Sequence, residues 1–441
     1  MGSPILILNI MNRLIIIISI TAIIASLGII GFVVYQNYQP IIQSSAKITQ
    51  SVVNFFPQAL DRILVSSSTN SSQFGNDPLT DKQSNQVITP LLEKISLKPV
   101  ASFDLLKTSK ETEILVYIEK ESGNIFSLKI ENQATSSPQT EPELIRLSNL
   151  TIPTVFEAYF GLDQAKNVQA LVRFPDQNRQ LQTISLSIEA NTTNSSASST
   201  NPWLIKTVKL SPNIYNFSVS PDKTTVFYLE NIGAKSIAYT ANFKLQNKKL
   251  MLVSPFSDWK INWSTTNTVY FYPRPDANYS ASLYVLNLKD RSFKKIINSV
   301  KGLSALASPD DQYITYTNSF NNDFNLLVHN NKTNSNTDLY LKTFPEKCLW
   351  DKDWPTIFCS APKQVAKGAY PNDWLLGQTN FNDSLWLVYP ELGKISLFYD
   401  FKTPDENLDL ISLKQDRFNN LYFIDRKTGT LYRLNSSRLL E

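Results

Sequence analysis

Side chains able to carry out catalysis or to hold a metal are scarce in this chain of 441 residues. It contains one histidine, His329, and two cysteines, Cys348 and Cys359. That inventory is too small for a zinc site of the usual cysteine and histidine type. The sequence also lacks a C-x-x-C pair, a G-x-S-x-G nucleophile elbow and a D-x-[DN]-x-[DN]-G calcium loop. We therefore expect no metal and no cofactor.

His329 and several aspartates remain as candidates for acid and base chemistry. A Ser-His-Asp hydrolase would need His329 as its base, but this residue ends the apolar run 326–328, and a solvated histidine at a strand end is the simpler interpretation. Paired carboxylates can hydrolyse glycosides. The candidates are Asp258, Asp310, Asp311, Asp351 and Asp353. Aspartates at repeated turns more often bond their own backbone, so we expect binding rather than catalysis.

The two cysteines flank a short hairpin that also contains Trp350 and Phe358. Opposite positions of an antiparallel ladder bring Cβ atoms close to disulfide reach. Oxidation is plausible in a domain outside the cytoplasm, so we predict a structural disulfide between Cys348 and Cys359. The alternative is a pair of buried free thiols.

Aromatic residues in the loops are the best candidates for contacts with a partner. Tryptophan and tyrosine dominate protein-binding hot spots, and their flat faces also stack on sugars. An insertion at about 361–380 is expected to form a loop on one face of the fold. The candidate partner-binding residues are Trp350, Trp354, Tyr370 and Trp374. The alternative is that these side chains pack between repeated units.

An uncharged apolar stretch covers residues 14–35, long enough to cross a bilayer as a helix. Arg13 precedes it, and the next basic residue is Lys47. By the positive-inside rule, residues 1–13 are cytoplasmic and the rest of the chain lies outside the cell membrane. A cleaved signal peptide is the alternative, but its apolar region would be shorter and followed by an A-x-A-like site. We expect a single-pass anchor.

Residues 36–89 form a juxtamembrane segment and a polar stalk, because their second half is rich in serine, threonine and asparagine. From residue 90 to 441 the pattern becomes that of β-strands throughout. The stalk is expected to hold this folded part away from the lipid.

A turn followed by a strand recurs along the second half of the chain. Ser220-Pro221-Asp222 precedes an apolar and aromatic run, and Ser308-Pro309-Asp310 does the same. Looser copies surround Thr266 and Asp353, and successive copies are about 44 residues apart, the period of a propeller blade. Counted by turn, the units centre near Lys110, Asp163, Asp222, Thr266, Asp310, Asp353 and Asp416. We predict an all-β, seven-bladed β-propeller.

The last unit supplies three strands, whereas a blade needs about four. We expect a segment before residue 100 to supply the fourth strand, since closing the ring with strands from both ends removes an exposed sheet edge.

The Ser-Pro-Asp turns, each followed by an aliphatic-x-Tyr strand, resemble the WD40-like repeat of TolB-type β-propellers. That family usually has glycine after the aspartate, where this chain has Lys223 and Asp311. The plan of anchor, stalk and propeller also resembles membrane-anchored bacterial propeller proteins. TolB-type propellers bind proteins, and some related propellers cap peptidases. The resemblance implies binding and assigns no functional residue.

The net charge of +4 is small and spread along the chain, which argues against a nucleic-acid binder. The sequence therefore predicts a membrane-anchored module outside the cytoplasm that binds or scaffolds an unknown protein or envelope polysaccharide. The alternative is an envelope enzyme that binds or cleaves glycans with carboxylates at the mouth of the propeller.

Overall fold

The computed structural model describes residues 91–131, 143–191, 202–352, 355–401 and 407–436. Contacts divide the chain into Ser84–Ser437 and a second unit of Met1–Gln83 with Arg438–Glu441; all described residues belong to the first. The predicted transmembrane helix 14–35, the segments 1–13 and 36–89, and Trp354 lie outside the described residues. Within the described ranges, no helix is long and apolar enough to cross a membrane.

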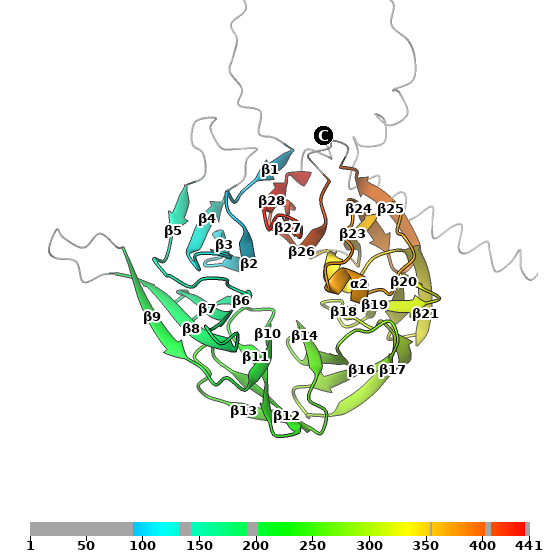
Figure 1. The fold of residues 1–441 in the computed structure, drawn as a ribbon, viewed down its shortest axis with the longest axis horizontal. Coiled ribbons are helices and arrows are strands. Elements are labelled where there is room, and N and C mark those ends of the chain that lie inside the picture. Colours follow the sequence, from blue (N-terminus) through cyan, green and yellow to red (C-terminus); the bar gives the residue numbers. More distant parts are fainter. Residues whose placement is uncertain (1–90, 132–142, 192–201, 353–354, 402–406, 437–441) are drawn as a thin grey trace, which may run out of the picture. The chain divides into compact units, whose positions relative to one another are not determined.

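Seven four-stranded antiparallel sheets surround a central axis and form a seven-bladed β-propeller (Figure 1). Blade 1 contains β2 (Val100–Lys107), β3 (Glu113–Glu119), β4 (Ile125–Ile130) and β5 (Leu144–Arg146). Blade 2 contains β6 (Glu157–Leu162), β7 (Val168–Pro175), β8 (Leu181–Ala190) and β9 (Trp203–Lys209). Blade 3 contains β10 (Ile214–Val219), β11 (Val226–Ile232), β12 (Lys235–Ala241) and β13 (Lys249–Ser254).

Blade 4 contains β14 (Trp259–Thr265), β15 (Thr268–Pro273), β16 (Ser280–Asn287) and β17 (Phe293–Lys301). Blade 5 contains β18 (Ala305–Ala307), β19 (Tyr313–Phe320), β20 (Asp323–Asn330) and β21 (Ser335–Leu341). Blade 6 contains β22 (Cys348–Trp350), β23 (Ile357–Pro362), β24 (Asp383–Tyr389) and β25 (Lys394–Tyr399). Blade 7 contains β26 (Leu410–Gln415), β27 (Leu421–Asp425), β28 (Leu431–Leu434) and β1 (Leu92–Lys94).

The hydrophobic core lies between neighbouring blades, because each sheet has a neighbour on both of its faces. Val116 and Ile118 of blade 1 pack with Phe160 and Val172 of blade 2 in one cluster. Central strands are therefore buried on both sides, and β7 is buried from Val168 to Arg173. This explains the consecutive apolar residues Ala170, Leu171 and Val172 in β7, which lack a strict alternation.

The Ser-Pro-Asp turns adopt one shared geometry. The serine hydroxyl oxygen accepts the backbone N–H five residues later, at 3.0 Å in both Ser220 and Ser308. Lys223 and Asp311, which follow the aspartates, have φ of 62° and 58°. This left-handed backbone costs a non-glycine residue about 1 kcal/mol, which explains why glycine is usual there.

Both side chains make contacts that glycine cannot. Lys223 Nζ donates to Asp104 Oδ2 of blade 1 at 2.8 Å. Asp311 accepts hydrogen bonds of 3.1 Å from Thr265 and Tyr270 of blade 4. In both cases a turn residue with strained backbone ties its own blade to another.

The ring closes with strands from both ends of the described chain, as predicted. Strand β1 pairs antiparallel with β28, and Leu92 lies opposite Leu434. The buried Arg433 forms an ion pair with Glu93, and Ser96 Oγ accepts the Leu431 N–H at 3.0 Å. The first residues of the propeller thus complete its last blade.

The structure also contains the predicted disulfide between Cys348 and Cys359. The two residues lie directly opposite each other on β22 and β23, the first two strands of blade 6.

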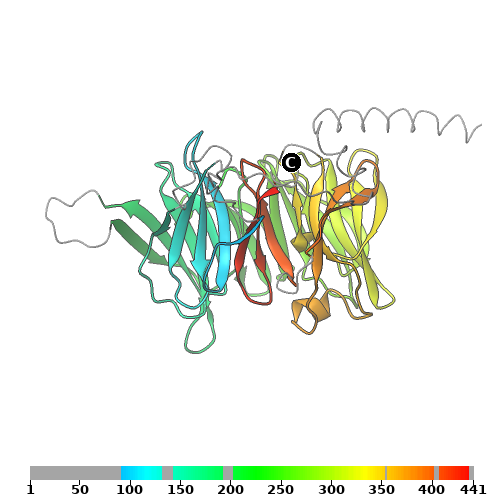
Figure 2. The ribbon, with the colours of Figure 1, turned by 90° about the horizontal axis from the view of Figure 1, so that it is seen from above.

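The two faces of the ring carry different loops. One face consists of the hairpins between the second and third strands of each blade and of the connections between blades. We call it the α2 face, because the insertion between β23 and β24 places helix α2 (Asn372–Leu375) there. The opposite face carries the other two hairpins of each blade. Figure 2 shows α2 projecting from one side of the ring.

Removal of β1 should destabilise the propeller by about 3 kcal/mol, at about 1 kcal/mol for each backbone hydrogen bond lost. We expect a chain of residues 99–441 to unfold at clearly lower temperature than one of residues 84–441, as measured by circular dichroism. Equal midpoints would show that this strand does not close the ring.

Candidate functional site

Exposed large apolar side chains occur on the outermost strands and on one face of the ring. Those on outermost strands are Leu144, Ile145, Leu204, Val208, Leu250, Val253, Tyr340, Ile395 and Leu397. The others belong to loops or strand ends of the α2 face: Leu97, Phe156, Ile232, Phe256, Tyr279, Phe320, Leu375 and Leu376. Among the described residues, the loops of the opposite face expose none. The α2 face is therefore the apolar face.

The insertion of blade 6 reaches two other blades. Asn372, the first residue of α2, donates to Asp276 Oδ2 at 3.1 Å and accepts the Ala277 N–H at 2.7 Å. Both partners belong to the β15–β16 hairpin of blade 4. On the other side, Arg426 of blade 7 donates to the Trp374 carbonyl at 2.5 Å. These contacts hold α2 across the face of blades 4 to 7.

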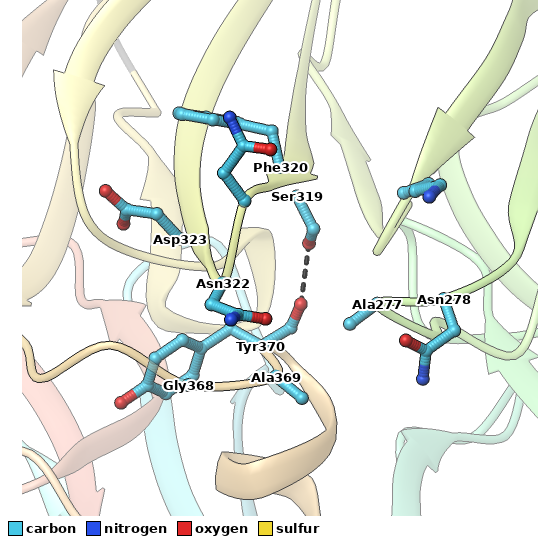
Figure 3. Close-up of a pocket in the computed structure, with 11 residues that line it drawn as sticks. Ala277, Asn278, Ser319, Phe320, Asn322, Asp323, Gly368, Ala369 and Tyr370 are labelled. Atoms are coloured by element: carbon cyan, nitrogen blue, oxygen red, sulfur yellow. Dashed lines mark hydrogen bonds between the residues drawn. The ribbon is translucent and has the colours of Figure 1, made fainter.

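A small hollow of about 150 Å³ lies beside this insertion. Ala277 and Asn278 form one side, and Phe320 with Asn322 forms another (Figure 3). Its floor is tied together because Ser319 Oγ donates to the Tyr370 carbonyl at 2.6 Å. Tyr279 follows Asn278 in the chain and is 75% exposed. We call Tyr279, Phe320, Leu375 and Leu376 the apolar patch.

The chemistry of the hollow is polar and includes one carboxylate. Asp323 lines it and forms an ion pair with Lys342 at 2.8 Å. Lys301, Ser319, Tyr370 and three asparagines provide the other polar side chains of the lining. Such groups can bind a partner by hydrogen bonds, whereas two carboxylates that act together on a glycoside are not brought together here.

A buried charge cluster lies behind α2. Lys347, Asp383 and Asp409 are fully buried, and Lys347 Nζ contacts Asp383 Oδ2 at 2.6 Å and also Asp409 Oδ1. Asp409 Oδ2 accepts the Trp374 indole N–H and the Phe381 backbone N–H, both at 3.1 Å. Because Trp374 belongs to α2, this cluster fixes the helix from below.

Two carboxylates share a single ammonium in this cluster, so it carries an excess negative charge in a dry environment. Burial raises the pKa of Asp383 to about 6, Lys347 opposes this rise and the neighbouring Asp409 adds to it. Asp383 Oδ1 is buried and accepts no hydrogen bond. Asp383 can therefore exchange a proton near neutral pH, unlike an ordinary aspartate.

Three of the predicted partner-binding aromatics are described, and all are buried. Trp350, Tyr370 and Trp374 are 6%, 2% and 4% exposed. Their burial matches the alternative of packing between repeated units: Trp350 packs against Tyr313 between blades 5 and 6, and the other two form the core under the insertion. Trp354 lies outside the described residues.

His329 is also not the solvated residue that we expected. It is 3% exposed on β20, and its Nδ1 is 2.9 Å from Asn336 Oδ1 of the neighbouring strand. The described candidate carboxylates are spread over the molecule. Asp310 accepts a backbone N–H of its own turn, and Asp311 accepts a hydrogen bond from blade 4. Asp258 forms an ion pair with Arg274.

Sequence reasoning missed the patch and the cluster. Leu375 and Leu376 follow Trp374 directly, so periodicity could not separate the buried ring from the exposed leucines. Lys347, Asp383 and Asp409 are far apart in the chain, and the sequence contains no spacing that links them. The useful signal was the insertion itself, predicted at about 361–380 and found between Pro362 and Asp383.

No protein-family model matches this chain, and no curated protein does so either. Among solved structures, it is similar to oligogalacturonate lyase from Vibrio parahaemolyticus, with 11% identity over 78% of this chain and 91% of that one, at a TM-score of 0.49. The propeller domain of the Trilobed protease from Pyrococcus furiosus has 9% identity over 77% and 94%, at 0.45. TolB from Acinetobacter baumannii has 12% over 72% and 78%, at 0.35.

Similarities at such low identity concern the fold alone. Within the described residues, no group of three or more His, Cys, Asp or Glu side chains is placed to hold a metal ion. The seven four-stranded sheets and their recurring turn make this chain a seven-bladed β-propeller, as the repeat predicted.

The ionisation of Asp383 should make stability depend on pH. A raised pKa in the folded state means that the folded protein binds more protons than the unfolded one between about pH 4 and 6, so stability falls as pH rises through this window. We expect the free energy of unfolding to decrease by about 1 kcal/mol more between pH 5 and 7.5 in the natural protein than in Asp383→Asn. Urea titrations at both pH values measure this difference, and identical pH dependence would contradict the assignment.

Proposed function

We propose that this protein is a membrane-anchored module that binds or scaffolds another protein at the cell surface through its α2 face. The observation that carries the proposal is that, among the described residues, the loops of the α2 face expose large apolar side chains and those of the opposite face expose none. Monomeric proteins rarely gather such groups on one surface without a binding role. The apolar patch occupies the part of this face where the insertion makes it least regular.

The patch has the composition of an interface centre. Tyr279 and Phe320 are aromatic, and Leu376 is 72% exposed directly after helix α2, which is fixed from below. Covering one such side chain contributes about 1.5–3 kcal/mol when it becomes fully buried. A patch carried on a fixed backbone loses less conformational entropy on binding than one on a flexible loop.

The neighbouring hollow favours glycan binding as a second candidate. It combines an aromatic wall, Phe320, with the amides of Asn278, Asn321 and Asn322, and sugars are bound by such ring faces and hydrogen-bonding groups. Cleavage is less well supported, because the single lining carboxylate, Asp323, is paired with Lys342.

The direction of β1 suits an anchor ahead of the propeller. This strand is outermost in blade 7 and is followed by the connection to β2, which belongs to the α2 face. The chain therefore enters β1 from the opposite face of the ring, so an anchor that precedes β1 is joined to the propeller on the face without α2.

Substitution of the α2 leucines tests this proposal. The full chain that carries Leu375→Ser and Leu376→Ser is incubated with solubilised envelope. We expect it to bind at least about tenfold less partner than the natural chain, because each serine removes about 1 kcal/mol or more of apolar burial at the interface. Quantitative mass spectrometry of the bound fraction gives the ratio.

The matched control is Leu250→Ser with Val253→Ser on β13, whose exposed fractions of 46% and 50% resemble that of Leu375, 45%. This control should bind as the natural chain does. Equal loss in both variants would contradict the proposal, and retention of a polysaccharide instead of a protein would favour the second candidate.

A further inference from the structure

The buried cluster behind α2 brings together an amine, a carboxyl group, two hydrogen-bond donors and a second carboxyl group. We propose that Lys347 and Asp409 react to form an intramolecular amide bond, with Asp383 as the acid and base that moves the protons. This would make the cluster a self-modification site, beyond the binding function proposed above.

The amine is held where water is excluded. Lys347 is fully buried, and its Nζ lies 5.4 Å and 5.3 Å from the ring centroids of Trp374 and Phe381. Its contacts with both carboxylates fix Nζ against Asp409. Such positioning replaces an encounter in solution by a reaction within one molecule, which raises the effective concentration of the amine by orders of magnitude.

Asp409 is the carboxyl group arranged to be attacked. Its Oδ1 contacts Lys347, while its Oδ2 accepts the Trp374 indole N–H and the Phe381 N–H. Two donors on one oxygen stabilise the negative charge that develops there when a nucleophile adds to the carbon. Asp383 has one backbone donor, Leu410, on the same oxygen that contacts Lys347, so it lacks this arrangement.

The protons can travel through Asp383. One proton passes from the Lys347 ammonium through Asp383 to Asp409 Oδ1. The free amine then attacks Asp409 Cγ, and the new C–N bond leaves a tetrahedral carbon with its negative charge on Oδ2. A second proton follows the same route from Nζ, and Oδ1 departs as water. The products are an amide and one water molecule, and Asp383 ends as it began.

Burial favours the product over the ion pair. The reaction replaces one positive and one negative buried charge by a neutral amide, and a charge in a dry interior is costly even when paired. A pKa of Asp383 near 6 suits a group that must accept and return protons at neutral pH. The exposed pair Lys363 and Asp400, by contrast, has its lysine 58% exposed to water.

The bond would join the two ends of blade 6. Lys347 directly precedes β22, and Asp409 directly precedes β26 of the next blade. An amide between them closes a covalent loop around blade 6 and its insertion, including α2. The helix that carries Leu375 and Leu376 would then be anchored by a bond that unfolding does not break.

Digestion of the full natural chain tests this directly. After reduction of the disulfide, trypsin should yield a branched peptide joining residues 343–352 to residues 403–414, lighter by one water than the two together. Cleavage after Lys347 should be absent, because trypsin does not recognise an acylated lysine. Fragmentation spectra locate the branch.

Two variants and one internal control test whether the branch depends on the residues of the cluster. Lys347→Arg keeps the charge without the nucleophilic amine and should give no branched peptide, and Asp383→Asn should lower its yield at least tenfold. No branch should join Lys363 to Asp400. Recovery of residues 343–347 and 348–352 as linear peptides from the natural chain, with no branched product, would overturn the proposal without depending on whether either variant folds.

Discussion

The arrangement of the α2 face depends on the buried contacts of Lys347 with two aspartates. A four-residue helix has no stability of its own, and α2 persists because Trp374 inserts beneath it and donates to Asp409. Asp409 is held in turn by Lys347, which lies in the connection between blade 5 and blade 6. A buried ion pair contributes little net stability but strongly penalises any arrangement that separates its members. The cluster therefore specifies one position for the insertion.

The propeller frame explains why the loops expose large apolar side chains on one face of the ring. Each blade buries both sides of its sheet against its neighbours, and β1 completes the last blade, so the ring offers few surfaces that can vary. The tight turns of the opposite face are used to join blades, as Lys223 and Asp311 demonstrate. The α2 face carries the connections between blades and the insertion, and there apolar side chains are exposed to solvent.

Much of the fold could be predicted because its signals are local and repeated. The Ser220 and Ser308 turns, the spacing of the units and the missing fourth strand together predicted seven blades and their closure. The disulfide between the two cysteines could be predicted in the same way, because the pairing of neighbouring strands places them opposite each other. The site was less accessible, because burial depends on contacts between distant segments. Trp374 and Leu376 differ by two positions in sequence, yet one is 4% and the other 72% exposed.

The most direct measurement of the central claim is site-specific photocrosslinking in intact cells that produce the full chain. A photoreactive amino acid at position 376, directly after α2, is compared with one at position 253 on β13; both positions are well exposed. Our account predicts a discrete adduct of higher mass from position 376 and none from position 253. Adducts of equal yield from both positions, or from position 253 alone, would show that the α2 face is not where this propeller meets its partner.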